Sequence, residues 1–150
     1  MRIDFKTEGF KQLADELEQL PRATGKNVLR RAGREALQPM LEAAKRNAPV
    51  DDGTLRDSIT IKNTKAKRQS RTRYAKSDGV SLSLGPTGRP EGGNAAWQEF
   101  GTVKQPAQPF MRPAADAEGE GVIDALGEAL AVQIKKATDR MARKLAKAGR

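Results

Sequence analysis

Residues 96–114 read AWQEFGTVKQPAQPFMRPA, and they hold the only Trp of the chain, two of its four Phe and three of its eight Pro. The first five residues are enough for one helical turn, and Gly101 follows as a residue type that tolerates the left-handed backbone at a helix end. Trp97 and Phe100 are three positions apart, so their rings can share one face of that turn. We expect this stretch to anchor the fold.

The three prolines shape the second half of the stretch. They exclude an ordinary helix or central strand and favour extended backbone until a new helix begins near Pro113. Phe110 and Met111 are then held in place. A stiff segment with large apolar side chains suits either an internal brace or a surface that lies in a neighbouring subunit, because proline lowers the ordering cost of both. The sequence leaves these two alternatives open.

A second block, APVDDGTLRDSI, occupies residues 48–59. This block, followed after a variable middle by EFGT at 99–102 and PAQPFMRPA at 106–114, resembles the small tail-component proteins of long-tailed double-stranded DNA bacteriophages. Such proteins are also described as tail-completion, head–tail joining or neck proteins. The resemblance extends over residues 5–148, although only the two blocks are specific to it.

The resemblance implies an α+β fold in which long helices pack on a small antiparallel sheet. It also implies a structural virion protein of a siphovirus, made in the host cytoplasm, which assembles as a six-fold or twelve-fold ring. The ring would complete the tail and help to join it to the head, beside head-closure, tail-terminator or tail-tube proteins. The residues that the match carries over, for the fold and for subunit contacts, are Asp52, Gly53, Leu55, Trp97, Phe100, Gly101, Thr102, Pro109, Phe110, Arg112 and Pro113.

Composition supports assembly and argues against catalysis. At 150 residues the chain is expected to form one domain with protruding arms, and 37% hydrophobic and 4% aromatic residues favour a protein that completes its burial by assembly. Cys and His are absent, which excludes Ser-His-Asp, Cys-His and ordinary zinc sites. The Asp and Glu residues are scattered, and the turn at 51–53 lacks the other ligands of a calcium loop. We therefore expect no enzyme activity, metal or cofactor.

The termini and the charge suggest where the protein acts. Residues 1–5 lack the apolar core of a signal peptide, and no apolar run is long enough to span a bilayer, so we expect no membrane contact and a cytoplasmic site of synthesis. The net charge of +9 favours polyanions, either nucleic acid or an acidic protein surface.

Apolar residues at helical spacing predict three main helices. The first covers residues 9–20, and the second covers 22–47 with a kink at Pro39. The last covers 121–148, about 40 Å, after a weak helical start or hinge at 114–121. The apolar stripe of this last helix comprises Val122, Ile123, Leu126, Leu130, Ile134, Ala137, Met141 and Leu145.

Alternating residues predict the strands. A short strand is expected at residues 1–6, and an antiparallel pair is expected between 55–63 and 79–85. The small residues Ala32, Gly33 and Ala36 would let another element approach the second helix closely.

Residues 62–76 contain seven cations and no acid, which predicts a solvated arm between the two paired strands. The arm is long for the resembled family. It is either a charged hairpin tip without a ligand or a contact for DNA phosphates or an acidic subunit. The candidate contacts in the arm and in the C-terminal helix are Lys65, Lys67, Arg68, Arg71, Arg73, Lys144 and Lys147.

The alternative function is a basic nucleic-acid-binding protein without enzymatic activity. It would use the arm and the C-terminal helix to neutralise phosphates. No helix-turn-helix, zinc or aromatic RNA-binding signature accompanies these cations in the sequence.

Overall fold

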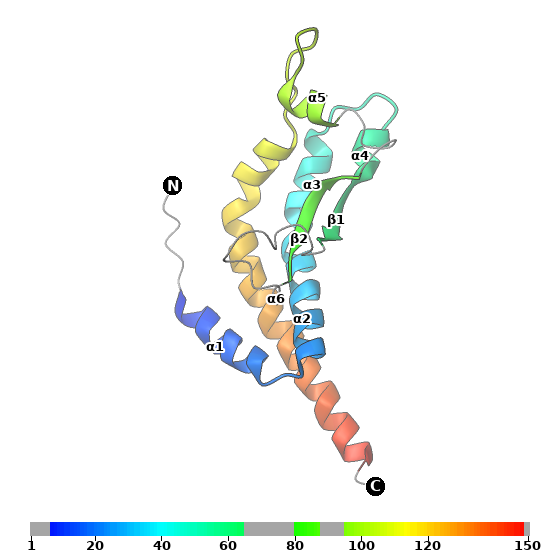
Figure 1. Cartoon of the computed structure of the whole chain (residues 1–150). Coiled ribbons are helices and arrows are strands. Elements are labelled where there is room, and N and C mark those ends of the chain that lie inside the picture. Colours follow the sequence, from blue (N-terminus) through cyan, green and yellow to red (C-terminus); the bar gives the residue numbers. More distant parts are fainter. Residues whose placement is uncertain (1–6, 65–79, 88–94, 149–150) are drawn as a thin grey trace, which may run out of the picture.

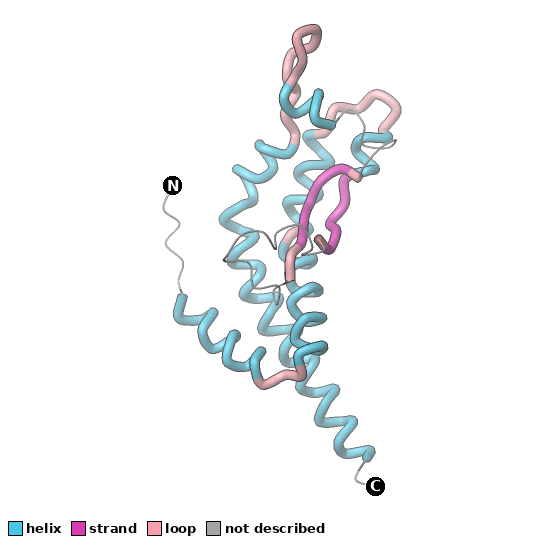
Figure 2. Tube along the Cα trace, in the orientation of Figure 1, coloured by secondary structure: helices cyan, strands magenta, loops and turns pink. Residues whose placement is uncertain are grey.

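The long C-terminal helix α6 (Met111–Ala148) runs along most of the length of the molecule, and α1, α2 and α3 pack against it (Figure 1). The computed structural model describes residues 7–64, 80–87 and 95–148. Helices dominate this part of the chain, with one small sheet beside them (Figure 2), so the α+β prediction is confirmed. The other described elements are α1 (Thr7–Glu18), α2 (Arg22–Ala36), α3 (Gln38–Asn47), α4 (Thr54–Ser58), β1 (Ile59–Asn63), β2 (Leu82–Pro86) and α5 (Ala95–Phe100).

Helix α6 begins at Met111, two residues before Pro113, near which the prolines predicted a new helix. It runs without a break for 38 residues, about 57 Å. Of the two alternatives for residues 114–121, the helical start is therefore right and the hinge is wrong, and the helix expected at 121–148 is the later part of a longer one. Gly119 and Gly121 each cost about 1 kcal/mol relative to Ala, but the Ala and Glu residues around them are strong helix formers. Leu145, placed on the apolar stripe by its spacing, is 72% exposed because α6 runs past the other helices at its C-terminal end (Figure 1).

The predicted second helix is two helices, α2 and α3, divided at Leu37. Pro39 is not in a helix interior but in the first turn of α3, where its missing N–H would have no intrahelical partner. The N–H of Leu37 donates to the carbonyl of Gly33 at 3.1 Å, so the chain turns tightly without leaving the helical path. The close approach expected at Gly33 is confirmed, since a Cβ there would lie 2.5 Å from Cδ1 of Leu82.

The sheet consists of β1 and β2 in antiparallel register, from Ile59 opposite Pro86 to Asn63 opposite Leu82. The predicted pairing is confirmed, but the first strand begins at Ile59. The prediction that it begins at residue 55 is wrong because Leu55 belongs to α4.

Two clusters of buried side chains fill the molecule. The upper core, at the α5 end, contains Ile59 and Phe110, the largest fully buried side chains, together with Ala43, Ala44, Ala48, Ala95 and Ala114. The lower core joins α1 and α2 to the second half of α6 through Leu20, Val28, Ala32, Leu130, Ile134 and Ala137. The upper core is made largely of Ala, whereas the lower core consists mostly of the aliphatic residues Leu, Val and Ile.

Some predictions fall outside the described residues. These are the strand at 1–6 and the arm residues Lys65, Lys67, Arg68, Arg71 and Arg73. Within the described ranges, no helix combines the length and apolar character needed to cross a membrane.

Candidate functional site

The two sequence blocks meet at one end of the molecule, where α4 and α5 lie beyond the end of α3 (Figure 1). Ala48 and Ile59 from residues 48–59 share the upper core with Phe110 and Ala114 from residues 96–114. The resemblance therefore identifies one connected structural unit. We consider this end as the candidate functional site.

Glu99 holds this unit together. Its carboxylate accepts the backbone N–H groups of Phe110 at 2.8 Å, Met111 at 2.9 Å and Arg112 at 3.1 Å, where α6 begins. The first N–H groups of a helix have no partners inside it, and the helix dipole favours negative charge at that end. Glu99 is thus a helix cap supplied from α5, which locks α5 onto the start of α6.

The sequence motif contains Glu99, but the resemblance assigns this residue no role. A signal was available: no Ser, Thr, Asp or Asn stands immediately before Met111 to cap the helix, and Glu99 is the only acidic residue in 96–114. A helix start without a local cap needs an acceptor from elsewhere in the chain.

The surroundings of Glu99 act on its pKa in opposite directions. Burial raises the pKa, but the N–H groups of Met111, Phe110 and Arg112 and the charge of Arg112 lower it by more. The net pKa lies below the ordinary 4.5, so the carboxylate is charged at neutral pH. Its side chain is buried, and Nε of Arg112 lies 3.6 Å from its Oε1.

The chain between α5 and α6 first folds back as a closed turn at residues 101–105, ahead of the segment that holds Pro106 and Pro109. Gly101 has a φ of +75°, and a Cβ there would lie 2.8 Å from the backbone nitrogen of Ala107. Thr102 and Gln105 pair as an isolated bridge. Gln98 secures the return, because its carbonyl accepts the N–H of Gln108 at 2.7 Å and its side chain accepts the amide of Gln105 at 3.0 Å.

This closed turn and α5 present three apolar side chains to solvent: Trp97 is 52% exposed, Phe100 70% and Val103 fully. We call α5 and residues 101–105 the knob. The guanidinium of Arg112 lies 5.2 Å from the ring centre of Phe100 and so connects the knob to α6. The stretch is therefore both a brace, through Phe110, and an exposed surface, through Trp97 and Phe100.

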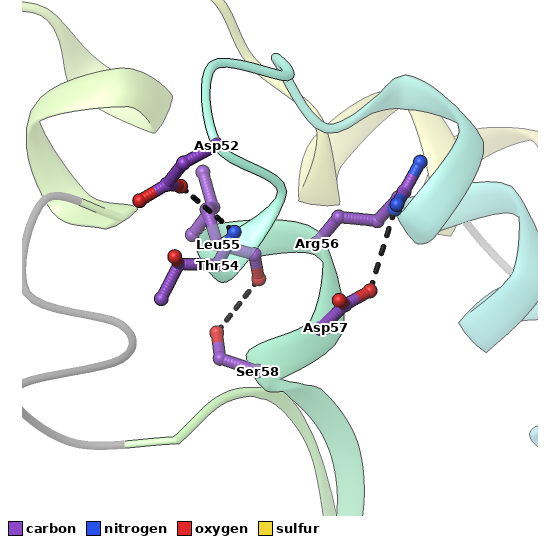
Figure 3. A network of polar contacts seen from close by, with 6 residues as sticks. All are labelled: Asp52, Thr54, Leu55, Arg56, Asp57 and Ser58. Atoms are coloured by element: carbon purple, nitrogen blue, oxygen red, sulfur yellow. Dashed lines mark hydrogen bonds and ion pairs between the residues drawn. The ribbon is translucent and has the colours of Figure 1, made fainter.

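The turn of the first block is built from polar contacts (Figure 3). Gly53 has a φ of +84°, and Asp52 Oδ1 accepts the N–H of Thr54 at 2.9 Å. The side chain and the N–H of Thr54 lower the pKa of Asp52. Ser58 Oγ donates to the carbonyl of Leu55 at 2.7 Å. These contacts make a helical turn at 54–58, which is why the strand starts later than predicted.

The remaining matched residues lie near the knob, and the C-terminal cations do not. Thr102, Pro109, Arg112 and Pro113 are all exposed at this end. Lys144 and Lys147 are exposed near the other end of α6. In the described part of the chain, no group of three or more His, Cys, Asp or Glu residues could hold a metal ion.

An apolar groove lies toward the opposite end, between α1 and the second half of α6. Its volume is about 700 Å³. Its apolar lining is Leu13, Leu20, Ala131, Ile134, Met141, Ala142 and Leu145, and Glu16 and Lys135 are among its polar residues. We call it the α1–α6 groove.

A protein-family model with the description "HK97-gp10_like: Bacteriophage HK97-gp10, putative tail-component" matches residues 11–101. The matched range includes all of residues 48–59 and ends at Gly101, inside the knob. No curated protein and no solved structure matches the chain.

Proposed function

Because the chain belongs to the HK97-gp10-like family of bacteriophage tail components, we propose that it forms a ring in the neck or proximal tail, which completes the tail and helps to join it to the head. As a tail component, it is a structural protein of the virion and acts among other tail proteins. To this family role we add three points: assembly as a ring, a position at the joint between tail and head, and a defined surface through which neighbouring subunits contact each other.

The observation that carries this proposal is the knob. Aromatic residues are typical of buried interface centres, and exposed apolar patches commonly mark interaction sites. Here Trp97, Phe100 and Val103 project from a base that is locked by Glu99 and Phe110. A rigid base lowers the ordering cost of binding, so the knob is well suited to insert into a partner.

We take the occupant of the α1–α6 groove to be the knob of a second copy of this chain. The knob presents apolar side chains and carries Lys104, with Arg112 beside it, and the lining of the groove is mostly apolar, with one acidic residue, Glu16, and one basic residue, Lys135. The two surfaces differ and lie toward opposite ends of one molecule (Figure 1). Contacts between two different surfaces generate rings when the rotation closes, which agrees with a six-fold or twelve-fold assembly.

Complementation of a phage that lacks this gene tests the role of the knob. The double variant Trp97→Ala, Phe100→Ala should fold normally, because both side chains are exposed. It should reduce infectious particles at least about ten-fold, since truncating aromatic anchors at an interface commonly weakens binding by more than that factor. Val132→Ala is the control, since Val132 is 48% exposed in the middle of α6. Equal yields from the double variant and the control would remove the knob from assembly.

Cross-linking tests the partner of the knob. The chain has no cysteine, so the double variant Val103→Cys, Ala142→Cys can form disulfides only at the introduced positions. The knob and the α1–α6 groove lie toward opposite ends of the folded molecule. A disulfide between the cysteine at position 103 in the knob and the cysteine at position 142 in the groove therefore joins two copies. Tails purified under oxidising conditions should give a ladder of covalent oligomers, and each single variant should not give that ladder. Monomers alone from the double variant would refute the knob-in-groove contact.

A further inference from the structure

A second groove lies between the first half of α2 and the second half of α6. These two helix segments are at the end of the molecule away from the knob (Figure 1). Its volume is about 200 Å³. The buried residues Val28 and Ala137 lie at its base, and Thr24 and Asn27 line one side. We call it the α2–α6 groove.

Four cations line this groove: Arg31 from α2, and Lys136, Arg140 and Lys144 from α6. All four are exposed. The three on α6 are four residues apart, so they form a row with a repeat of about 6 Å and a length of about 12 Å. None of the four is in an ion pair within the described residues.

The lining contains no Asp or Glu. Gln133, which also lines the groove, donates its amide to Oε1 of Glu35 at 2.8 Å, so that carboxylate oxygen is already engaged. Asn27 uses its side-chain oxygen to accept from Arg30 at 3.1 Å, which leaves its NH₂ group as a donor. The groove therefore offers positive charge and neutral donors to an anion.

We propose that the α2–α6 groove binds the phosphate backbone of duplex DNA without reading its sequence. Phosphates of one DNA strand follow one another every 3.4 Å along the axis, so a row of about 12 Å lies alongside about three or four of them. The lining has no aromatic residue, which disfavours a single strand held by base stacking. Cations that contact phosphates position a protein on DNA but carry no sequence information.

This inference goes beyond the proposed ring contact and does not depend on it. The row on α6 begins at Lys136, more than twenty residues from the start of the helix at the knob. The α1–α6 groove, which is proposed to hold the knob of a neighbour, uses other side chains of α6; only Met141 lines both grooves. A knob variant should therefore bind DNA like the wild-type chain even if it fails to assemble.

The test uses two variants of the full chain that lose the same net charge. The groove variant changes Arg31, Lys136, Arg140 and Lys144 to Gln, and the control variant changes Lys11, Arg34, Lys45 and Arg46, which line neither groove, to Gln. Because residues 65–76 are the same in both, their contribution cancels. Affinity is measured for a 30-base-pair duplex of arbitrary sequence, over a range of salt concentrations, and for a poly-glutamate peptide. Circular dichroism and thermal unfolding check that both variants fold.

The groove variant should bind the duplex at least about ten-fold more weakly at 50 mM salt, and its slope of log affinity against log salt should be shallower by about 3 to 4. The control should change that slope by less than about 1. A charge-preserving variant, Arg31→Lys with Arg140→Lys, should keep the wild-type slope. Equal losses in groove and control variants would overturn the proposal. A second result would also overturn the proposal: poly-glutamate binds as tightly as the duplex, and the groove variant loses this binding. That result would identify an acidic protein as the partner.

Discussion

At the scale of single residues, Glu99 decides how the functional end is built. One carboxylate accepts three N–H groups that belong to the start of another helix, and Arg112 adds its charge at 3.6 Å. Buried charges are stable only when their hydrogen-bonding capacity is well used. Glu99 meets this condition, so its removal should be costly even though it is one of many acidic residues.

Glu99→Gln should lower the free energy of unfolding by about 2 kcal/mol, because hydrogen bonds to a charged group are worth about 1.5 to 3 kcal/mol and the amide replaces them incompletely. Glu120→Gln is the matched control, since Glu120 is exposed on α6. Urea unfolding of the two variants measures the difference. Equal stabilities would mean that the cap contributes nothing.

The comparison of the wild-type chain with Glu99→Gln also predicts how stability depends on pH. The folded pKa of Glu99 lies below the ordinary 4.5, so its contribution to stability is fully present above about pH 4.5 and is lost as the pH falls through the folded pKa. The stability gap between the wild-type chain and Glu99→Gln should therefore be constant near neutral pH and narrow below pH 4.5. Asp52 is present in both proteins, so its contribution to the pH dependence is the same in both and cancels in the stability gap. A gap that stays the same down to acid unfolding would contradict the assignment.

At the scale of elements, local patterns predicted what depends on neighbouring residues and missed what depends on distant ones. The turn of helix before Gly101 and the antiparallel pairing were both predictable from spacing. The prolines also predicted the start of α6 near Pro113, but its cap was missed, because the capping residue is Glu99, twelve residues before Met111. Similarly, Leu145 has the spacing of a core residue, but no other element extends far enough to cover it.

The knob could be predicted only in part. The sequence left open whether residues 96–114 brace the interior or face a neighbour, because both roles use the same residue types. Tertiary packing assigns the roles by residue: Phe110 is 1% exposed and Phe100 is 70% exposed. Neither aromatic has a local signal that distinguishes it from the other.

This difference between the two Phe residues gives a prediction at the element scale. Phe110→Ala empties a buried aromatic site and should lower the free energy of unfolding by about 3 to 5 kcal/mol. Phe100→Ala removes an exposed ring and its contact with Arg112, which should cost less than about 1 kcal/mol. Chemical denaturation of both variants gives the comparison. Similar losses for the two would show that the stretch is not divided into brace and surface.

At the scale of the whole molecule, the surfaces proposed for contact lie apart. The knob lies at one end, and the α1–α6 and α2–α6 grooves lie on either side of α6 toward the other end. A long helix connects these sites, so a subunit can contact a neighbour at each end while its basic face stays available. This arrangement suits a ring around a polyanion and needs no catalytic step.

The most direct test of this account is electron microscopy of lysates from a phage with a stop codon in this gene. Filled heads, free tails and joined particles are counted against the same phage supplied with the wild-type chain. The proposed role predicts filled heads beside separate or abnormal tails, and restoration of joined particles by the wild-type chain. Normal joined particles without the protein would contradict a role in completing or joining the tail.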